Sequence, residues 1–123
     1  MTLNELYNAI GADYDEAMKR LVSERLISKY IVKFPEDGSY NELMECWKNG
    51  EDTDRLFRAA HTLKGVCLNL ALVDLFEIVN VITDHFREGT GKQVDNIDEY
   101  FDKMEAQYNM MIELIKDFAN QQQ

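Results

Sequence analysis

Apolar residues recur three and four positions apart along almost the whole chain, which is the spacing of one face of an α-helix. The alternation of apolar and polar residues that is typical of strands is rare. The pattern is clearest near the C-terminus, where spacings of four and three alternate through Ile97, Phe101, Met104, Tyr108, Met111, Ile115 and Phe118. The sequence therefore predicts an all-α protein whose last helix covers about residues 95–119 and packs along one seam.

The first third of the chain predicts short helices separated by turn residues. Thr2 and Glu5 have the spacing of a capping box and open a helix that runs to about Ala9, with Gly11 after its end. Asp13 with Glu16 opens a second segment that runs through residue 21. Ser23 is placed to cap a third helix, and its apolar stripe consists of Leu26, Ile27, Tyr30, Ile31 and Phe34.

The rest of the chain predicts four longer helices. Pro35 and the "EDGS" after it break the chain, and the "EGTGK" at 88–92 breaks it again. Ser39 with Glu42 predicts a capping box for a helix near 40–50, and Asp52 or Thr53 caps the next. The four expected helices lie near 40–50, 53–70, 74–88 and 95–119.

Short connections between these helices imply antiparallel neighbours. We therefore expect an antiparallel up-down four-helix bundle over residues 36–119 within a single domain, 1–123. Residues 1–35 supply one or two short accessory N-terminal helices, or the first helix of the bundle. Residues 120–123 are expected to form a disordered tail.

Charge and composition exclude several classes of partner. The net charge of −10 is unfavourable for binding the phosphate backbone of nucleic acids and for binding anionic membranes. No apolar run approaches the roughly 20 residues of a membrane span, and no basic-then-apolar leader opens the chain. We expect a cytoplasmic monomer that binds neither nucleic acid nor membrane.

Metal and thiol chemistry find little support in the sequence. Cys46 and Cys67 lie 21 residues apart among apolar residues, without a CxxC or a nearby histidine pair, so we expect reduced core residues. Neither His61 nor His85 has a glutamate three residues before it, as a metal-binding bundle enzyme would need. His85 is interpreted as a residue of the surface or of the rim of a partner site.

His61 lies on the outer face of its predicted helix. At about 100° per residue, Leu56, Ala59, Leu63, Val66, Cys67 and Leu70 fall roughly 140° to 240° away from it and form the core stripe. Phe57, Lys64, Gly65 and Leu68 fall within about 60° of it on the outer side. Two apolar residues grouped around an exposed histidine indicate a docking surface.

The chemistry that fits this arrangement is transfer of an anionic group to the imidazole. A neutral ring nitrogen is a good nucleophile near neutral pH, and Lys64 is close enough to offset the charge of a phosphoryl group. Gly65, one turn along, leaves the ring open to an approaching group. The sequence has no glycine-rich nucleotide loop and no kinase signature, so donor and acceptor must lie in other proteins.

The segment "FRAAHTLKG" at 57–65, continued by "VCLNLAL", resembles the histidine-containing phosphotransfer (HPt) domains. These domains carry a phosphorylated histidine, a lysine three residues later and a glycine four residues later, which His61, Lys64 and Gly65 match. Ala71 departs from the pattern, because many members have glycine ten residues after the histidine. The resemblance implies a four-helix bundle with an exposed histidine midway along one helix.

The resemblance also implies a role and a set of partners. His61, phosphorylated on Nε2, would accept a phosphoryl group from a receiver-domain aspartate and pass it to another receiver, in response regulators or hybrid histidine kinases. The chain would hold no cofactor or metal, would not be an autonomous enzyme, and would rely on magnesium bound by the receiver. The candidate partner-docking residues are Phe57, Arg58, Leu68, Thr83 and Arg87.

Three other functions remain open at this point. The chain would also suit the phosphotransfer domain of a chemotaxis-type kinase, phosphorylated by a separate ATP-binding domain. A helical adaptor would dock receiver domains without being phosphorylated, although the intact His61, Lys64 and Gly65 weigh against it. A metal-binding bundle enzyme is the least favoured.

Overall fold

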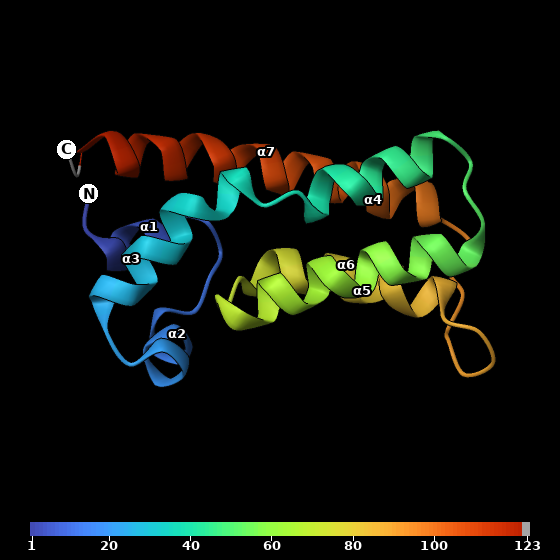
Figure 1. Cartoon of the computed structure of the whole chain (residues 1–123), viewed down its shortest axis with the longest axis horizontal. Helices are drawn as coiled ribbons and strands as arrows, with labels where there is room; N and C mark the ends of the chain where they lie inside the picture. The colour runs from blue at the N-terminus through green and yellow to red at the C-terminus, as the bar shows by residue number, and fades with distance from the viewer. Residues whose placement is uncertain (122–123) are drawn as a thin grey trace.

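The structure is a computed structural model that describes residues 1–121, and these residues form helices joined by turns and by a longer loop at 87–96 (Figure 1). This confirms the predicted all-α fold. The elements are α1 (Leu3–Ala9), α2 (Tyr14–Leu21), α3 (Glu24–Lys33), the 3₁₀ turn η1 (Phe34–Glu36), α4 (Ser39–Lys48), α5 (Thr53–Asn69), α6 (Val73–Phe86) and α7 (Ile97–Gln121).

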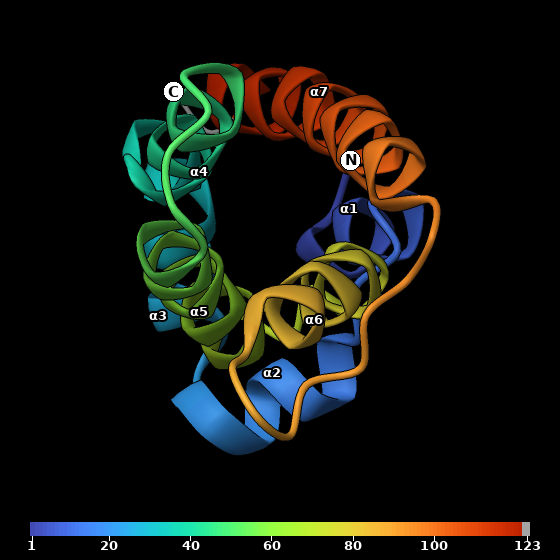
Figure 2. The same cartoon turned by 90° about the vertical axis from the view of Figure 1, so that its right-hand side faces the viewer.

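Helices α4, α5, α6 and α7 form the predicted antiparallel bundle, which Figure 2 shows end-on. Helix α5 packs between α4 and α6, and α6 packs on α7. Helix α7 is 25 residues long, whereas α4 has only 10. The far half of α7 is therefore covered by α1 and α3, and α3 lies roughly in line with α4 (Figure 1).

Aromatic stacking closes the bundle between α4 and α7. Trp47 stacks on Phe101 with ring centroids 4.2 Å apart, and Tyr40 stacks on Tyr108 at 3.6 Å. Burial raises the pKa of Tyr40 to about 12. The predicted seam of α7 faces this core, because all its members from Phe101 to Phe118 are buried and Ile97 is half-buried.

Most predicted helix starts are confirmed. Thr2 and Glu5 form a capping box, and the side chains of Asp13, Ser23 and Asp52 each accept a backbone N–H at the start of a helix. The predicted capping box of α4 is wrong. Gly38 precedes the helix, and the Oδ1 of Asp37 accepts the Ser39 N–H at 2.9 Å instead.

The N-terminal helices are tied to the turn between α5 and α6. Asp13 donates its N–H to the Ala71 carbonyl at 2.9 Å, and Asp74 donates to the Gly11 carbonyl at 2.9 Å. Helix α2 therefore lies beneath the end of the α5–α6 pair, which Figures 1 and 2 both show. Residues 1–35 consequently act as accessory helices, with α3 also extending the wall of the bundle.

Helix α7 continues to Gln121, beyond the predicted start of the C-terminal tail. The predicted tail begins too early, because Asn120 and Gln121 continue α7 and the Gln121 side chain accepts a hydrogen bond from the N-terminal amine at 3.0 Å. Residues 122–123 lie outside the described residues. Along 1–121, none of the helices combines the length and apolar character needed to cross a bilayer.

Candidate functional site

His61 lies in the middle of α5, and its side chain is exposed. The residues predicted to face the core, Leu56, Ala59, Leu63, Cys67 and Leu70, are buried, and Val66 is half-buried. The helical periodicity therefore placed the imidazole on the correct face. Cys46 and Cys67 are free thiols in the core, and burial raises the pKa of the Cys67 thiol to about 12.

Gly65 opens one flank of the imidazole. A Cβ built at this position meets no atom of the described residues within 4 Å, so the glycine faces open space. A glycine in a helix interior costs about 1 kcal/mol relative to alanine, and no tight packing at Gly65 offsets this cost. The open space beside the ring is therefore a feature of the surface around His61.

Lys64 is held by an aromatic ring on the neighbouring helix. Its Nζ lies 6.0 Å from the ring centroid of Phe76 on α6, and both side chains are half-buried. The sequence predicted Lys64 but missed Phe76. Phe76 could have been noticed in the sequence, because it is a large apolar residue outside the inner stripe of α6.

A second cation, Arg87, lies against Phe57, which is one turn before His61 on α5. The ring of Phe57 is 5.7 Å from the imidazole, and the Arg87 guanidinium lies 5.0 Å from the same Phe57 ring. The Nε of Arg87 also pairs with Oδ1 of Asp84 at 3.3 Å. Arg87 follows α6 directly, so the antiparallel arrangement of α5 and α6 brings it beside Phe57.

The other predicted docking residues divide into two groups. Arg58 is exposed and pairs with Asp54 at 3.1 Å, and Leu68 is 44% exposed. Thr83 is fully buried, and its hydroxyl donates to the Val79 carbonyl at 2.8 Å, so its prediction as a docking residue is wrong. It lies four residues after the buried Val79 and therefore belongs to the inner face of α6.

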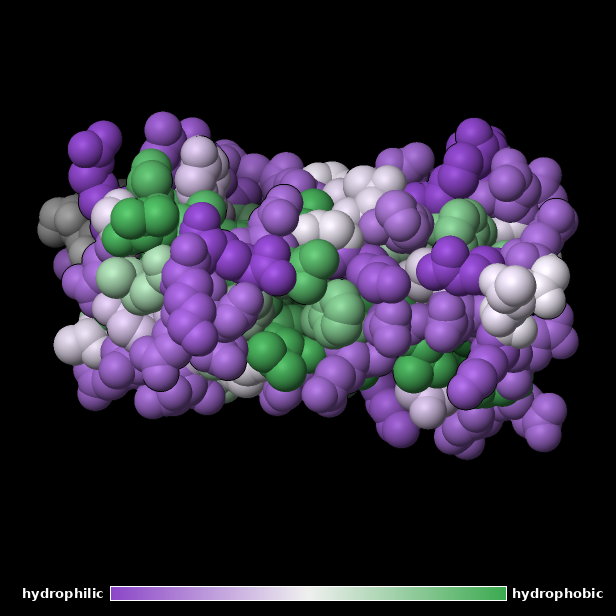
Figure 3. Space-filling view, turned by 90° about the horizontal axis from the view of Figure 1, so that it is seen from below, coloured by the Kyte–Doolittle hydropathy of each residue, from purple (hydrophilic) through white to green (hydrophobic). Residues whose placement is uncertain are grey.

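The face formed by α5 and α6 is partly apolar. Figure 3, which looks onto this side of the molecule, shows hydrophobic side chains gathered near its centre among hydrophilic ones. Leu68 and Val73 are the exposed large apolar residues of these two helices, and Phe57 and Phe76 are half-buried. An apolar group of this kind around an exposed histidine fits a protein-docking surface.

His85 lies in the last turn of α6. Its ring is half-buried, and its Nδ1 accepts the Val94 N–H at 3.0 Å. This bond joins the last turn of α6 to the segment that leads into α7. The sequence did not predict this bond, by which the His85 ring fixes a loop, and a place for His85 at the rim of a partner site stays a prediction.

Chemically, the arrangement offers an exposed nitrogen nucleophile with Lys64 three residues along the same helix and Arg87 against the Phe57 ring that neighbours the imidazole. Within residues 1–121, His, Cys, Asp and Glu side chains nowhere gather in a group of three or more that would hold a metal ion. That the chain works without a cofactor stays a prediction.

The comparisons with known proteins give one match. The family model described as Hpt domain matches residues 2–117. No curated protein and no solved structure shows a significant match. The family match covers nearly all of the described helices, including the accessory helices α1 to α3.

Proposed function

Because the chain belongs to the Hpt-domain family, whose members are phosphotransfer modules of two-component signalling, we propose that His61 is its phosphoryl-carrying residue. The His61 imidazole accepts a phosphoryl group from the aspartate of one receiver domain and returns it to the aspartate of another. The observation that carries this proposal is the exposed imidazole next to the open space at Gly65.

The transfer is a displacement at phosphorus. The lone pair of the imidazole Nε2 forms the N–P bond, the P–O bond to the aspartyl group breaks, and the aspartate leaves as a carboxylate. The proton on the other ring nitrogen stays on the ring or passes to water. In the second step a receiver carboxylate attacks the same phosphorus, and the nitrogen recovers its lone pair. The receiver supplies the magnesium ion.

Lys64 and Arg87 would supply positive charge to the phosphorylated ring. Lys64 lies over the ring of Phe76, and Arg87 lies over the ring of Phe57. These cation–π contacts would keep both cations near the surface that a receiver covers. Transfer of this kind depends mainly on positioning and on charge stabilisation. The geometry supports a module that presents the histidine while the receiver provides the remaining groups.

The test is incorporation of phosphate from isolated receiver domains that have been labelled with radioactive acetyl phosphate. We expect the parent protein to acquire label that is stable to base and labile to acid, His61→Gln to acquire none, and His85→Gln to match the parent. The two variants are a matched pair, because each removes one of the two histidines. Equal labelling of His61→Gln and the parent would contradict the assignment.

Two further measurements distinguish the proposed function from a kinase-associated phosphotransfer domain and from a non-phosphorylated adaptor. Labelling by ATP and the catalytic domain of a histidine kinase, but not by any phosphorylated receiver, would favour the kinase-associated role. Receiver binding without any phosphate incorporation would favour the adaptor. Circular dichroism checks that both histidine variants keep the helical content of the parent.

A further inference from the structure

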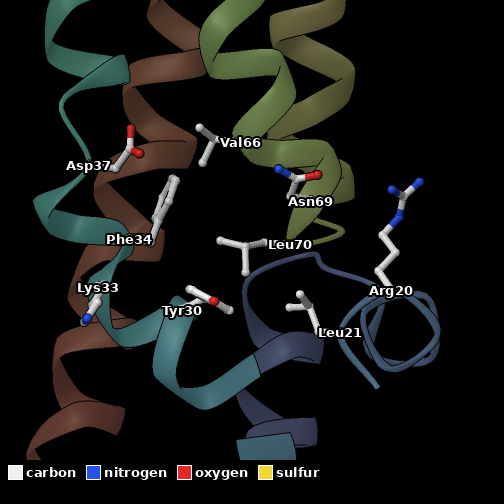
Figure 4. A pocket seen from close by; sticks show the side chains of 9 residues that line it. All are labelled: Arg20, Leu21, Tyr30, Lys33, Phe34, Asp37, Val66, Asn69 and Leu70. Atoms are coloured by element: carbon white, nitrogen blue, oxygen red, sulfur yellow. The ribbon is translucent and has the colours of Figure 1, made fainter. Parts of the chain in front are cut away.

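The imidazole of His61 has different surroundings on its two sides along α5. On the C-terminal side Gly65 has no side chain, and a Cβ there would meet no atom of the described residues within 4 Å. Beyond Gly65 the helix runs into a groove between α5 and the accessory helices, to which it contributes Val66, Asn69 and Leu70 (Figure 4). The C-terminal side therefore leaves room for an approaching group.

The N-terminal side of the imidazole is occupied by Phe57. The two residues are four apart on α5, where side chains are neighbours, and helical side chains lean toward the N-terminus. Their ring centroids lie 5.7 Å apart, with the ring planes tilted by 39°. Phe57 is half-buried and packs against the core of the bundle. The exposed imidazole therefore contacts a ring that the core holds in place.

Phe57 also contacts the cation Arg87. The Arg87 guanidinium lies 5.0 Å from the centroid of the Phe57 ring. The Arg87 backbone N–H donates to the Asp84 carbonyl at 3.2 Å, and its Nε pairs with Oδ1 of Asp84 at 3.3 Å. The loop packs against Arg87 as well, because a Cβ at Gly91 would lie 2.3 Å from the Arg87 carbonyl oxygen. Arg87 is therefore fixed after α6, with its side chain against the ring that neighbours His61.

We propose that Phe57 is a positioning residue for phosphoryl transfer to His61. Its ring restricts the rotation of the imidazole and keeps the Arg87 guanidinium beside it. Both effects act on the N–P bond that forms at His61, since such transfers depend on positioning and on charge stabilisation. The inference rests on the proposed function. It goes beyond the prediction that Phe57 docks a partner, because the ring acts on the imidazole when no partner is bound.

The first test labels His61 with phosphoramidate, a small donor that needs no protein surface. The imidazole lone pair forms the N–P bond, the P–N bond of phosphoramidate breaks, and ammonia leaves with the electron pair of that bond. We expect Phe57→Leu to be labelled about fivefold more slowly than the parent, because loss of the aromatic pair frees the imidazole. Phe57→Tyr keeps the ring, and its rate is expected to lie within about twofold of the parental rate.

The matched control is Tyr100→Leu. Tyr100 is a half-buried aromatic residue of α7, and the Nζ of Lys103 lies 4.9 Å from the centroid of its ring. The change therefore removes a cation–π pair of the same kind from a different helix. We expect its labelling rate to stay within about twofold of the parental rate, as for a distant, independent site. Equal labelling rates in Phe57→Leu and Tyr100→Leu would overturn the proposal.

Proton NMR of the His61 ring checks the cause of the slower reaction. The Phe57 ring current acts on the imidazole C–H protons, so we expect their signals to move in Phe57→Leu. They are expected to stay near the parental positions in Phe57→Tyr and Tyr100→Leu. Circular dichroism checks that all three variants keep the helix content of the parent. Imidazole signals at the parental positions in Phe57→Leu would contradict positioning through ring contact.

The link to Arg87 is tested by a double-mutant cycle of Phe57→Leu and Arg87→Gln. The cation offsets the charge of the incoming phosphoryl group, so Arg87→Gln alone is expected to slow labelling by phosphoramidate about threefold. If the Phe57 ring holds the guanidinium, Arg87→Gln has little further effect once Phe57 is leucine. Fully additive effects would show that Phe57 does not hold Arg87 for the reaction.

Receiver domains phosphorylated with acetyl phosphate distinguish positioning from docking. We expect Phe57→Leu to lower the maximal transfer rate, and to leave unchanged the receiver concentration that gives half of this rate. The reverse result would make Phe57 a docking residue and overturn the proposal. If phosphoramidate labels His61 but no receiver of a panel transfers to the parent, the proposed function is wrong, whereas the phosphoramidate rates still decide the role of Phe57.

Discussion

Each of the two histidines of this chain lies near a glycine, but the surface around His61 and Gly65 is open whereas the loop around His85 and Gly91 is closely packed. His61 is exposed, and a Cβ at the nearby Gly65 would meet nothing within 4 Å among the described residues. His85 is half-buried and accepts a backbone N–H. A Cβ at Gly91, in the loop that His85 holds, would lie 2.2 Å from the Asp84 carbonyl oxygen.

The comparison shows that a histidine and a nearby glycine can leave a surface open or close a loop, according to what surrounds them. Around His61 the space stays open, and the cations Lys64 and Arg87 rest on aromatic rings. Around His85 the space is filled, because the loop packs back onto the last turn of α6.

Gly91→Ala is expected to destabilise the protein by about 2 to 3 kcal/mol. The added methyl group would overlap the backbone carbonyl oxygens of Asp84 and Arg87, at 2.2 and 2.3 Å, so the loop would have to move. Urea denaturation followed by circular dichroism measures the loss. A free energy of unfolding equal to that of the parent would show that the loop is not packed as described.

Gly65→Leu is expected to slow phosphoryl transfer from a receiver domain at least about tenfold, or about 1.4 kcal/mol. The leucine side chain would fill the open space beside the imidazole and block the approaching partner. Helix content stays the same, because Gly65 packs against nothing. Single-turnover transfer kinetics check this. Transfer at the parental rate would show that access to the imidazole does not depend on the open space at Gly65.

His85→Ala is expected to cost about 1 kcal/mol and to expose one specific amide. The Val94 N–H loses its acceptor, so its hydrogen exchange becomes faster. The matched variant His61→Ala should leave the exchange at Val94 as it is in the parent. Amide exchange measured by NMR distinguishes the two, and an unchanged Val94 in His85→Ala would contradict the role of His85.

Gly65→Ala is expected to stabilise the protein by about 0.5 to 1 kcal/mol. Alanine is the better helix former, and the structure leaves room for its methyl group. Urea denaturation of the two proteins measures the difference. A loss of stability would show that Gly65 has a packing role, like Gly91.

Sequence periodicity was enough for the bundle and for the exposure of His61, because both depend on which face of one helix a residue occupies. It failed where a contact joins two elements. The pairing of Lys64 with Phe76 depends on how α5 crosses α6, and the bond from Val94 to His85 spans a loop. Neither contact has a spacing within one helix that would reveal it.

Local rules also failed at positions where two interpretations compete. Thr83 was predicted as a docking residue from the resemblance to the family, yet its spacing of four from Val79 places it inside. Ser39 with Glu42 matches a capping box, but the preceding Asp37 takes the Ser39 N–H. Ala71 adopts a φ of 55°, which explains why glycine is common at this position in related domains.

The most direct test of the central claim is to map the phosphorylated residue by tandem mass spectrometry after incubation with a phosphorylated receiver domain. Because the chain has only two histidines, the result distinguishes them fully. We predict phosphate on the peptide that contains His61 and none on the peptide that contains His85. Phosphate on His85, or on a residue other than histidine, would contradict the account.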